Sequence, residues 1–146
     1  MIRVFLDANV LFSAARPPGG VCRDIFRVAE KRGDVLLLAT WYVIGEADIK
    51  LIYRGLSPIS PPRVALQLLI SRQVTRCSRP SIELNQRLGL LLSDPYDAPV
   101  LAGAVSAKAD WLVTGNTKDF GHLYEETVEG VLILEPRAAL NRLTQL

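Results

Sequence analysis

Short apolar runs alternate with longer amphipathic stretches along the chain. The runs are rich in aliphatic and β-branched residues with few polar residues between them, which is typical of strands buried on both faces. They cover Ile2–Leu6, 35–39, Trp111–Val113 and Val131–Leu134, and residues 73–77 form one further candidate. Strands of this kind occur in sheets that helices cover on both sides, so the runs predict a parallel sheet of four to five strands.

The stretches between the runs carry apolar residues at the three- and four-residue spacing of helices that pack on one side. They predict helices at 7–15, 21–32, Trp41–Tyr53, 64–69, 81–92, 97–107 and 137–143. Prolines and glycines interrupt the pattern at 16–20 and 57–62, which must be connections. Because parallel neighbours need long crossovers, the alternation predicts a single three-layer α/β/α domain over residues 1–146.

For the helix Trp41–Tyr53, the sequence also predicts the cap and the buried face. Thr40 is expected to cap the helix Trp41–Tyr53, since a threonine before a helix accepts from its free backbone N–H groups. The spacing of Ile44, Ile49 and Ile52 places these three side chains on its inward face.

Composition and charge say little about the function. The chain has 17 basic and 15 acidic side chains, so its formal net charge of +2 neither requires nor excludes a nucleic-acid partner. Cys22 and Cys77 lack metal-ligand spacing and are expected to be free thiols, as in a reducing cytosol. The apolar run before Asp7 is too short for a signal peptide or a membrane span, which indicates a cytoplasmic protein without membrane contact.

Acidic residues stand at comparable places in the predicted fold. Asp7 follows the first strand, Glu46 lies in the helix after the second, and Asp97 begins the helix before the strand Trp111–Val113. Each has an ordinary alternative as a helix cap or a solvated surface charge, but all three can face one edge of the sheet. Carboxylates held together repel one another unless a cation neutralises them. Oxygen ligands favour Mg²⁺ or Mn²⁺, and such ions serve phosphodiester cleavage, whereas the lone His122 is expected at the surface.

The motifs around these acids resemble those of the PIN domain family, especially its VapC-like toxins of type II toxin–antitoxin pairs. The matching stretches are FLDANVL from Phe5, ATWYVIGE ending at Glu46, DPYDAPVLAGA from Asp94, ADWLVTGNTKDF from Ala109 and GVLILEPRAAL from Gly130. The resemblance implies a PIN fold and a ribonuclease that depends on Mg²⁺ or Mn²⁺ and leaves a 5′-phosphate. It also implies that Asp7, Glu46 and Asp97 are metal-binding catalytic acids, and that a small antitoxin is the partner. A homodimer is expected as well, because segment 41–56 is richer in apolar residues than one buried face requires.

The chain departs from the family pattern at one position. Many PIN domains have an acid after the strand in a TGD sequence, whereas this chain has Asn116. Asparagine still offers a carbonyl oxygen to a metal but brings no charge. Asp119 is either the replacement metal ligand or a turn residue before Phe120.

Substrate contacts have to come from residues outside the acids. The candidates are Arg16, Thr114 and Lys118, followed by Arg23 and Arg54. The basic ones would attract phosphate, and Arg16 is the best placed because its loop is expected to lie near Asp7.

Two other functions fit parts of the pattern. A receiver-like phosphotransfer domain would also place Asp7 and Thr114 at strand ends, but it needs no Glu46 and usually has a second acid beside Asp7. A catalytically weakened PIN domain that binds RNA or protein is the other alternative, and Asn116 supports it.

Overall fold

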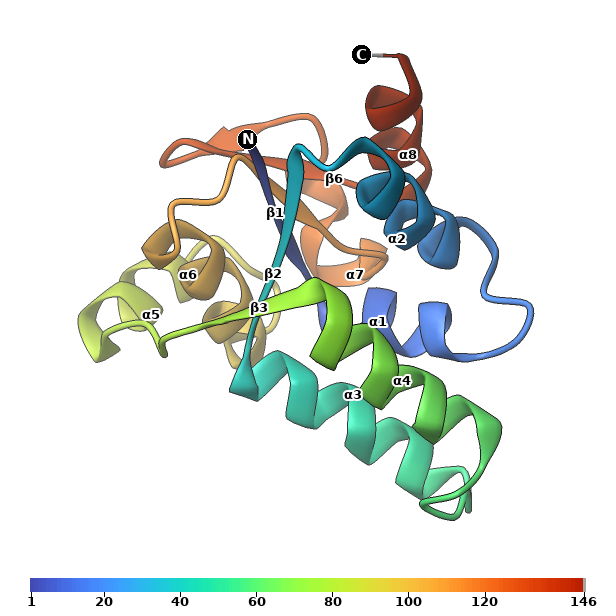
Figure 1. Ribbon diagram of the computed structural model, residues 1–146. Helices are drawn as coiled ribbons and strands as arrows, with labels where there is room; N and C mark the ends of the chain where they lie inside the picture. Colours follow the sequence, from blue (N-terminus) through green and yellow to red (C-terminus); the bar gives the residue numbers. More distant parts are fainter. Residues whose placement is uncertain (146) are drawn as a thin grey trace.

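Five parallel strands form the middle layer of the computed structural model, which describes residues 1–145 (Figure 1). The sheet has the order β3-β2-β1-β4-β6-β5, and only the edge strand β5 is antiparallel. The strands are β1 Ile2–Leu6, β2 Val35–Thr40, β3 Val74–Cys77, β4 Trp111–Val113, β5 Thr127–Val128 and β6 Val131–Leu134. The expected parallel sheet is therefore confirmed, with β5 as an unpredicted sixth strand.

Helices cover both faces of the sheet and complete the predicted three-layer α/β/α architecture. Helices α5 and α6 lie on one face, whereas α1, α2 and α8 lie on the other (Figure 1). The helices are α1 Ala8–Ala15, α2 Gly20–Arg32, α3 Trp41–Tyr53, α4 Pro61–Gln73, α5 Ile82–Gly89, α6 Ala98–Ser106, α7 Thr117–Phe120 and α8 Pro136–Gln145. Two short 3-10 turns, Pro95–Asp97 and Gly121–Leu123, precede α6 and follow α7. Among residues 1–145, no helix is both long and apolar enough to cross a membrane.

The beginnings and ends of several helices follow from single residues. Thr40 caps α3 as expected, because its hydroxyl oxygen accepts from the backbone N–H of Val43 at 3.4 Å. Gly33 ends α2 in the left-handed conformation, with a φ of 75°, and its N–H donates to the carbonyl of Ala29. Gly103 brings α6 close to the sheet, since a Cβ there would lie 3.0 Å from the ring of Phe5.

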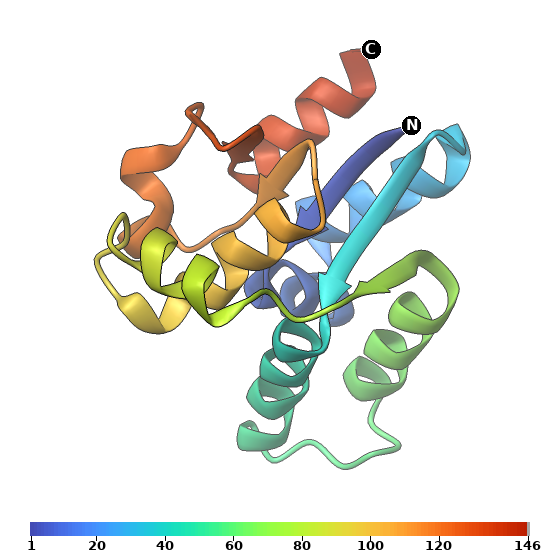
Figure 2. The ribbon, with the colours of Figure 1, turned by 90° about the vertical axis from the view of Figure 1, so that its left-hand side faces the viewer.

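Helix α3 shows a different buried face from the one expected. Ile44 is buried, but Ile49 and Ile52 are 49% and 45% exposed, so their predicted inward position is wrong. The residues that α3 buries are Val43, Ile44, Ala47 and Leu51. The cause is visible in Figure 2, where α3 and α4 project away from the sheet as a pair of helices. Helix α3 packs mainly on α1, and its outer side leaves Ile49 and Ile52 about half exposed.

The register of the central strands brings distant residues to one edge. Leu6 of β1 is paired with Val113 of β4, and both strands run in the same direction. The next residues along the chain, Asp7 and Thr114, therefore leave the sheet side by side. The carboxyl ends of parallel strands are where ligands bind in open α/β sheets.

Candidate active site

Asp7 stands at the end of β1 and is almost fully buried, with 4% of its surface exposed. One carboxylate oxygen accepts from the backbone N–H of Ala8 at 2.7 Å, as the cap of α1. The other accepts from the hydroxyl of Thr114 at 2.7 Å and from the amide of Asn9 at 3.1 Å. Burial raises the pKa of Asp7 above its usual value, and these hydrogen bonds act in the opposite direction. The carboxylate is thus held in one orientation.

Thr114 and Asn9 together link the ends of β1 and β4. Thr114 is fully buried and its hydroxyl donates to Asp7, so the side chain expected to contact substrate instead orients an acid. The side-chain oxygen of Asn9 accepts from the backbone N–H of Gly115 at 2.7 Å. Tyr124 donates its hydroxyl to the carbonyl of Thr114 at 2.8 Å. This network sets the position of Asp7 relative to the loop after β4.

A second group of acids lies where that loop meets the start of α6. Carboxylate oxygens of Asp94, Asp97 and Asp119 lie within 4.8 Å of one another. The side-chain amide of Asn116 donates to Asp97 and to Asp119, at 3.2 Å in each case. Its side-chain oxygen accepts from the backbone N–H of Asp119 at 3.3 Å and caps α7. Asn116 therefore holds two carboxylates together that would otherwise repel each other.

Asp97 and Asp119 shift each other's pKa in opposite directions. Burial, the hydrogen bond to Asp119 and the nearby negative charges raise the pKa of Asp97 to about 7. The pKa of Asp119 moves down, chiefly because protonated Asp97 donates to it. We call Asp94, Asp97 and Asp119 the acid cluster.

The surroundings of Asp119 indicate that the acid cluster can bind a cation. The residue is 4% exposed, and its Oδ1 has no hydrogen-bond partner among residues 1–145. A buried carboxylate oxygen without a donor is costly, whereas a bound cation would satisfy it. The potential metal ligands in the acid cluster are all carboxylate oxygens, which suit a hard divalent ion. The cluster can therefore hold a metal ion.

Glu46 lies on α3, within the electrostatic field of Asp7. Burial and the charge of Asp7 raise the pKa of Glu46, while Lys50, one turn later on α3, lowers it. The raised pKa of Tyr42 also connects the two groups of acids, because after burial its causes are Glu46, Asp97, Asp7 and Asp94. The three acids expected to share one cation thus influence one another, but the acids in closest contact are those of the acid cluster. A common cation for Asp7, Glu46 and Asp97 stays a prediction.

The basic candidates have different surroundings. Arg16 and Arg54 both stack on the ring of Phe12, with guanidinium carbons 5.1 and 5.0 Å from its centre. Arg23 donates to the carbonyl of Ala14, so it serves to hold α1 against α2. Lys118 is exposed on α7, and its charge lowers the pKa of Asp119.

The remaining expectations concern His122 and the cysteines. The ring of His122 is exposed and lies 2.8 Å from the carbonyl of Leu91, in agreement with a surface position. Cys22 and Cys77 are free thiols, as expected.

Sequence reasoning missed three residues of this site. Asp94 belongs to the acid cluster, and its signal was its place three residues before Asp97, across a proline-containing turn. Asn9 was visible only as part of the DANVL motif, two residues after Asp7. Lys50 lies four residues after Glu46, which is one helical turn, and its charge also acts on Asp7.

The fold is a three-layer α/β/α domain with a mostly parallel sheet, and acidic residues gather at the carboxyl ends of its strands. Residues 3–118 match the family model described as the PIN domain, and the chain belongs to the PIN domain family. No curated protein matches the chain in sequence.

Two solved structures share the fold. The crystal structure of PAE2754 from Pyrobaculum aerophilum is similar with a TM-score of 0.69 and 19% identity, over 99% of this chain and 97% of that one. The crystal structure of VapBC2 from Rickettsia felis, bound to a DNA fragment from its promoter, is similar with a TM-score of 0.64 and 17% identity. That match covers 92% of this chain and 98% of the other. At these identities the likeness concerns the fold.

Proposed function

We propose that the protein is a metal-dependent endoribonuclease that hydrolyses RNA phosphodiester bonds. The observation that carries the proposal is the acid cluster, with carboxylates within 4.8 Å and one buried oxygen that lacks a partner. Membership of the PIN domain family supports it, because these domains are generally nucleases. Membership of the PIN domain family also argues against the alternative that the protein is a receiver-like phosphotransfer domain.

Mg²⁺ or Mn²⁺ is the proposed cofactor, held by Asp97 and Asp119 with Asp7, Glu46 and the side-chain oxygen of Asn116 as further candidates. When bound, such an ion lowers the pKa of water and stabilises the negative charge on the phosphate oxygens. The protein residues orient and charge the site. Two donors keep the oxygens of Asp7 in position, since one oxygen accepts from the backbone N–H of Ala8 and the other from the hydroxyl of Thr114.

Asp97 has a second role as a carrier of a proton. With a pKa of about 7, its carboxyl group gains and loses a proton near neutral pH, while the lowered pKa of Asp119 keeps that acid ionised. Positive charge brought into the cluster would favour the ionised form of both acids. Glu46, with its own raised pKa, is the candidate that accepts a proton on the side of Asp7.

We further infer that the protein is the toxin of a toxin–antitoxin pair, with a small antitoxin protein as partner in the cytoplasm. The fold shared with VapBC2, a complex solved on promoter DNA, supports this inference. A homodimer through the outer side of α3 and α4 is also proposed. That surface exposes large apolar side chains, namely Ile49, Ile52, Tyr53, Ile59, Val64 and Leu68. In each subunit of this dimer, residues 1–146 are proposed to form a single domain.

The weakened PIN domain that only binds RNA or protein is retained as the second candidate. Asn116 favours it, because the family often has an acid at this position and an amide adds no charge for a metal.

One assay separates the two candidates. The rate of cleavage of an RNA substrate would be measured over a titration of Mn²⁺, for the wild type, Asp7→Asn and the control Asp24→Asn. Asp24 is paired with Arg27 on the surface of α2, so its change alters the net charge equally without touching the site. We expect metal-dependent cleavage by the wild type and the control, and its loss in Asp7→Asn. Cleavage by none of the three, or equally by all, would reject the ribonuclease proposal.

A further inference from the structure

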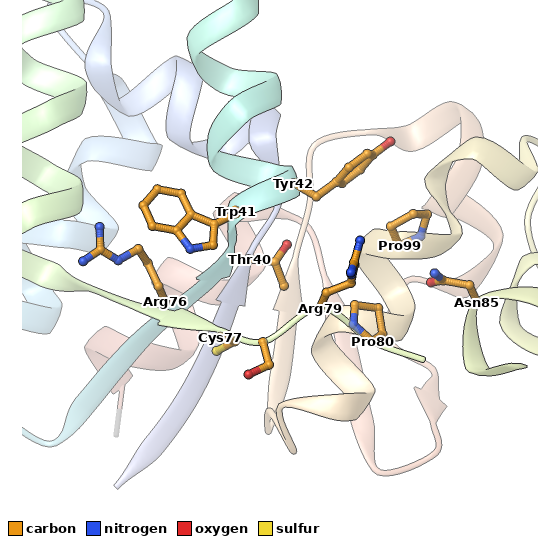
Figure 3. A pocket seen from close by; sticks show the side chains of 10 residues that line it. Thr40, Trp41, Tyr42, Arg76, Cys77, Arg79, Pro80, Asn85 and Pro99 are labelled. Carbon is orange, nitrogen blue, oxygen red and sulfur yellow. The ribbon is translucent and has the colours of Figure 1, made fainter. Parts of the chain in front are cut away.

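A cavity of about 630 Å³ lies between the first turn of α3 and the segment that joins β3 to α5 (Figure 3). Trp41 and Tyr42 line it from α3, whereas Arg76 and Arg79 line it from the β3 side, and Asn85 comes from α5. Its volume falls within the range of about 300–1,000 Å³ that is common for small-molecule sites. The cavity is large enough for one nucleotide.

The cavity lies next to the segment that carries Asp97. The hydroxyl of Tyr42 donates to the carbonyl of Tyr96, the residue before Asp97, at 3.1 Å. Pro99, two residues after Asp97, lines the opposite wall (Figure 3). A second cavity of about 420 Å³ shares Tyr42, Asn85 and Pro99 with the first and continues to Tyr96. The two hollows therefore adjoin each other, and the second reaches the residues on either side of Asp97.

Positive charge at the end of the first cavity away from Asp97 is free to meet an anion. Arg76 and Arg79 are both exposed, and neither forms an ion pair or a side-chain hydrogen bond within the described part of the chain. The guanidinium carbon of Arg76 lies 4.6 Å from the centre of the Trp41 ring, which holds both side chains in place. Trp41 is nonetheless 64% exposed, so much of the indole remains available for stacking.

Exposed aromatic rings beside free guanidinium groups are the means by which proteins bind single-stranded nucleic acid. Unpaired bases stack on the rings, and the backbone phosphates pair with the arginines. A duplex would keep its bases inside and could not fill a cavity of this kind. The acid cluster repels the phosphates of RNA, so RNA binding needs positive charge nearby. Arg76 and Arg79 would provide that charge.

We propose that this cavity binds one unpaired nucleotide of a single-stranded RNA, next to the phosphate that is cleaved. The base lies against Trp41 and Tyr42, and a phosphate contacts Arg76 and Arg79. The choice of RNA rests on the proposed ribonuclease function. The proposal adds to it a binding cavity outside the acid cluster and the residues that would contact the nucleotide there.

The test measures binding separately from cleavage. The affinity of a short fluorescein-labelled single-stranded RNA would be determined by fluorescence anisotropy in EDTA, with the duplex of the same sequence for comparison. The variants are Trp41→Ala, Trp41→Phe and Arg79→Ala, with Arg137→Ala as control. Arg137 is an exposed arginine at the start of α8, which packs on α2.

We expect Trp41→Ala to weaken binding by about fivefold or more, since loss of a stacked base has at least that effect. Trp41→Phe should restore most of the affinity because it retains a ring. Arg79→Ala should lower the slope of log affinity against log salt by about 0.7, the value for one phosphate of a single strand. Arg137→Ala should bind as the wild type does. All of these side chains are exposed, so circular dichroism should show intact folding.

Three results would overturn the proposal. The first is wild-type affinity in both Trp41→Ala and Arg79→Ala, and the second is equal affinity for single-stranded and duplex RNA. The third is a change of sedimentation in the variants without a change of RNA binding, which would make the cavity an interface between two copies. If no protein cleaves RNA with Mn²⁺ but the cavity variants bind more weakly, the ribonuclease proposal fails while the nucleotide site stands.

Discussion

Replacing Asn116 with aspartate tests whether the Asn116 amide stabilises the acid cluster when no metal is bound. In the wild type the Asn116 amide donates to Asp97 and Asp119 at 3.2 Å each. Asn116→Asp removes both hydrogen bonds and adds a negative charge between two existing ones. The metal-free protein should therefore become less stable, whereas the protein with bound metal should regain the loss.

The size of the effect follows from these contacts. A hydrogen bond to a charged group contributes about 1.5–3 kcal/mol, and partial exposure of Asp97 reduces its share. We expect the free energy of unfolding of the metal-free protein to fall by about 2 kcal/mol in total. At about 2–4 °C per kcal/mol, this corresponds to a drop in Tm of about 4–8 °C.

The assay is the melting temperature of each protein in EDTA and over a titration of Mn²⁺. A ligand at a hundred times its Kd stabilises the folded state by about 2.7 kcal/mol, so metal should offset the loss in Asn116→Asp. Asn116→Ala is the control, because it removes the same donors without adding a charge, and it should show the loss but no larger metal effect. An Asn116→Asp protein that melts in EDTA at the wild-type temperature would refute the role of the amide. A metal shift no larger than that of the wild type would refute the role of the charge.

Three further predictions concern the pKa of Asp97 and the surface of α3. Because the pKa of Asp97 rises from 3.8 to about 7 on folding, the folded state retains a proton that the unfolded state loses, so the metal-free protein should lose stability between about pH 4 and 7. Metal must displace that proton, so Mn²⁺ affinity measured by calorimetry should rise with pH up to about 7 and then level off. An affinity independent of pH from about 6 to 8 would contradict the raised pKa of Asp97. Ile52→Lys should convert the proposed dimer to a monomer in sedimentation, since Ile52 is 45% exposed on α3; an unchanged dimer would place the interface elsewhere.

Strands β1, β2, β4 and β6 were predictable from sequence because they are predominantly apolar. Trp111–Val113 is buried throughout and has parallel strands on both sides, and this burial is what removes polar residues from its sequence. The strand Thr127–Val128 and the helix Thr117–Phe120 were missed because elements of two and four residues are too short to show a period. Their positions depend on neighbours, namely β6 for the strand and the cap of Asn116 for the helix.

The error in α3 has a related cause. Periodicity gives the spacing of the apolar face but not how many sides of a helix have neighbours. Ile49 and Ile52 are apolar and at helical spacing, yet they remain exposed because α3 projects beyond the sheet. Apolar residues on a helix with more than one apolar side indicate either a second buried face or a surface for association.

The candidate site was predictable to the level of its elements but not of its contacts. Strand ends place Asp7 and Thr114 together, and this follows from parallel pairing alone. The sequence could not show that Thr114 is buried beneath Asp7, or that a 3-10 turn brings Asp94 within reach of Asp97 and Asp119. These contacts depend on loop conformations, which have no periodic signal.

Asn116 has a different meaning in the structure than it has in the sequence. From the motif, an amide in place of an acid indicates a weakened metal site. In the folded protein the amide bridges Asp97 and Asp119, and Asp119 brings a buried carboxylate oxygen to the same place. We therefore propose that Asp119 supplies the charge that the motif lacks at residue 116, while the amide allows the carboxylates to stay close when no cation is present. This arrangement supports an active enzyme more than a binding module, because a module that bound no metal would have no use for a buried, unpartnered carboxylate oxygen.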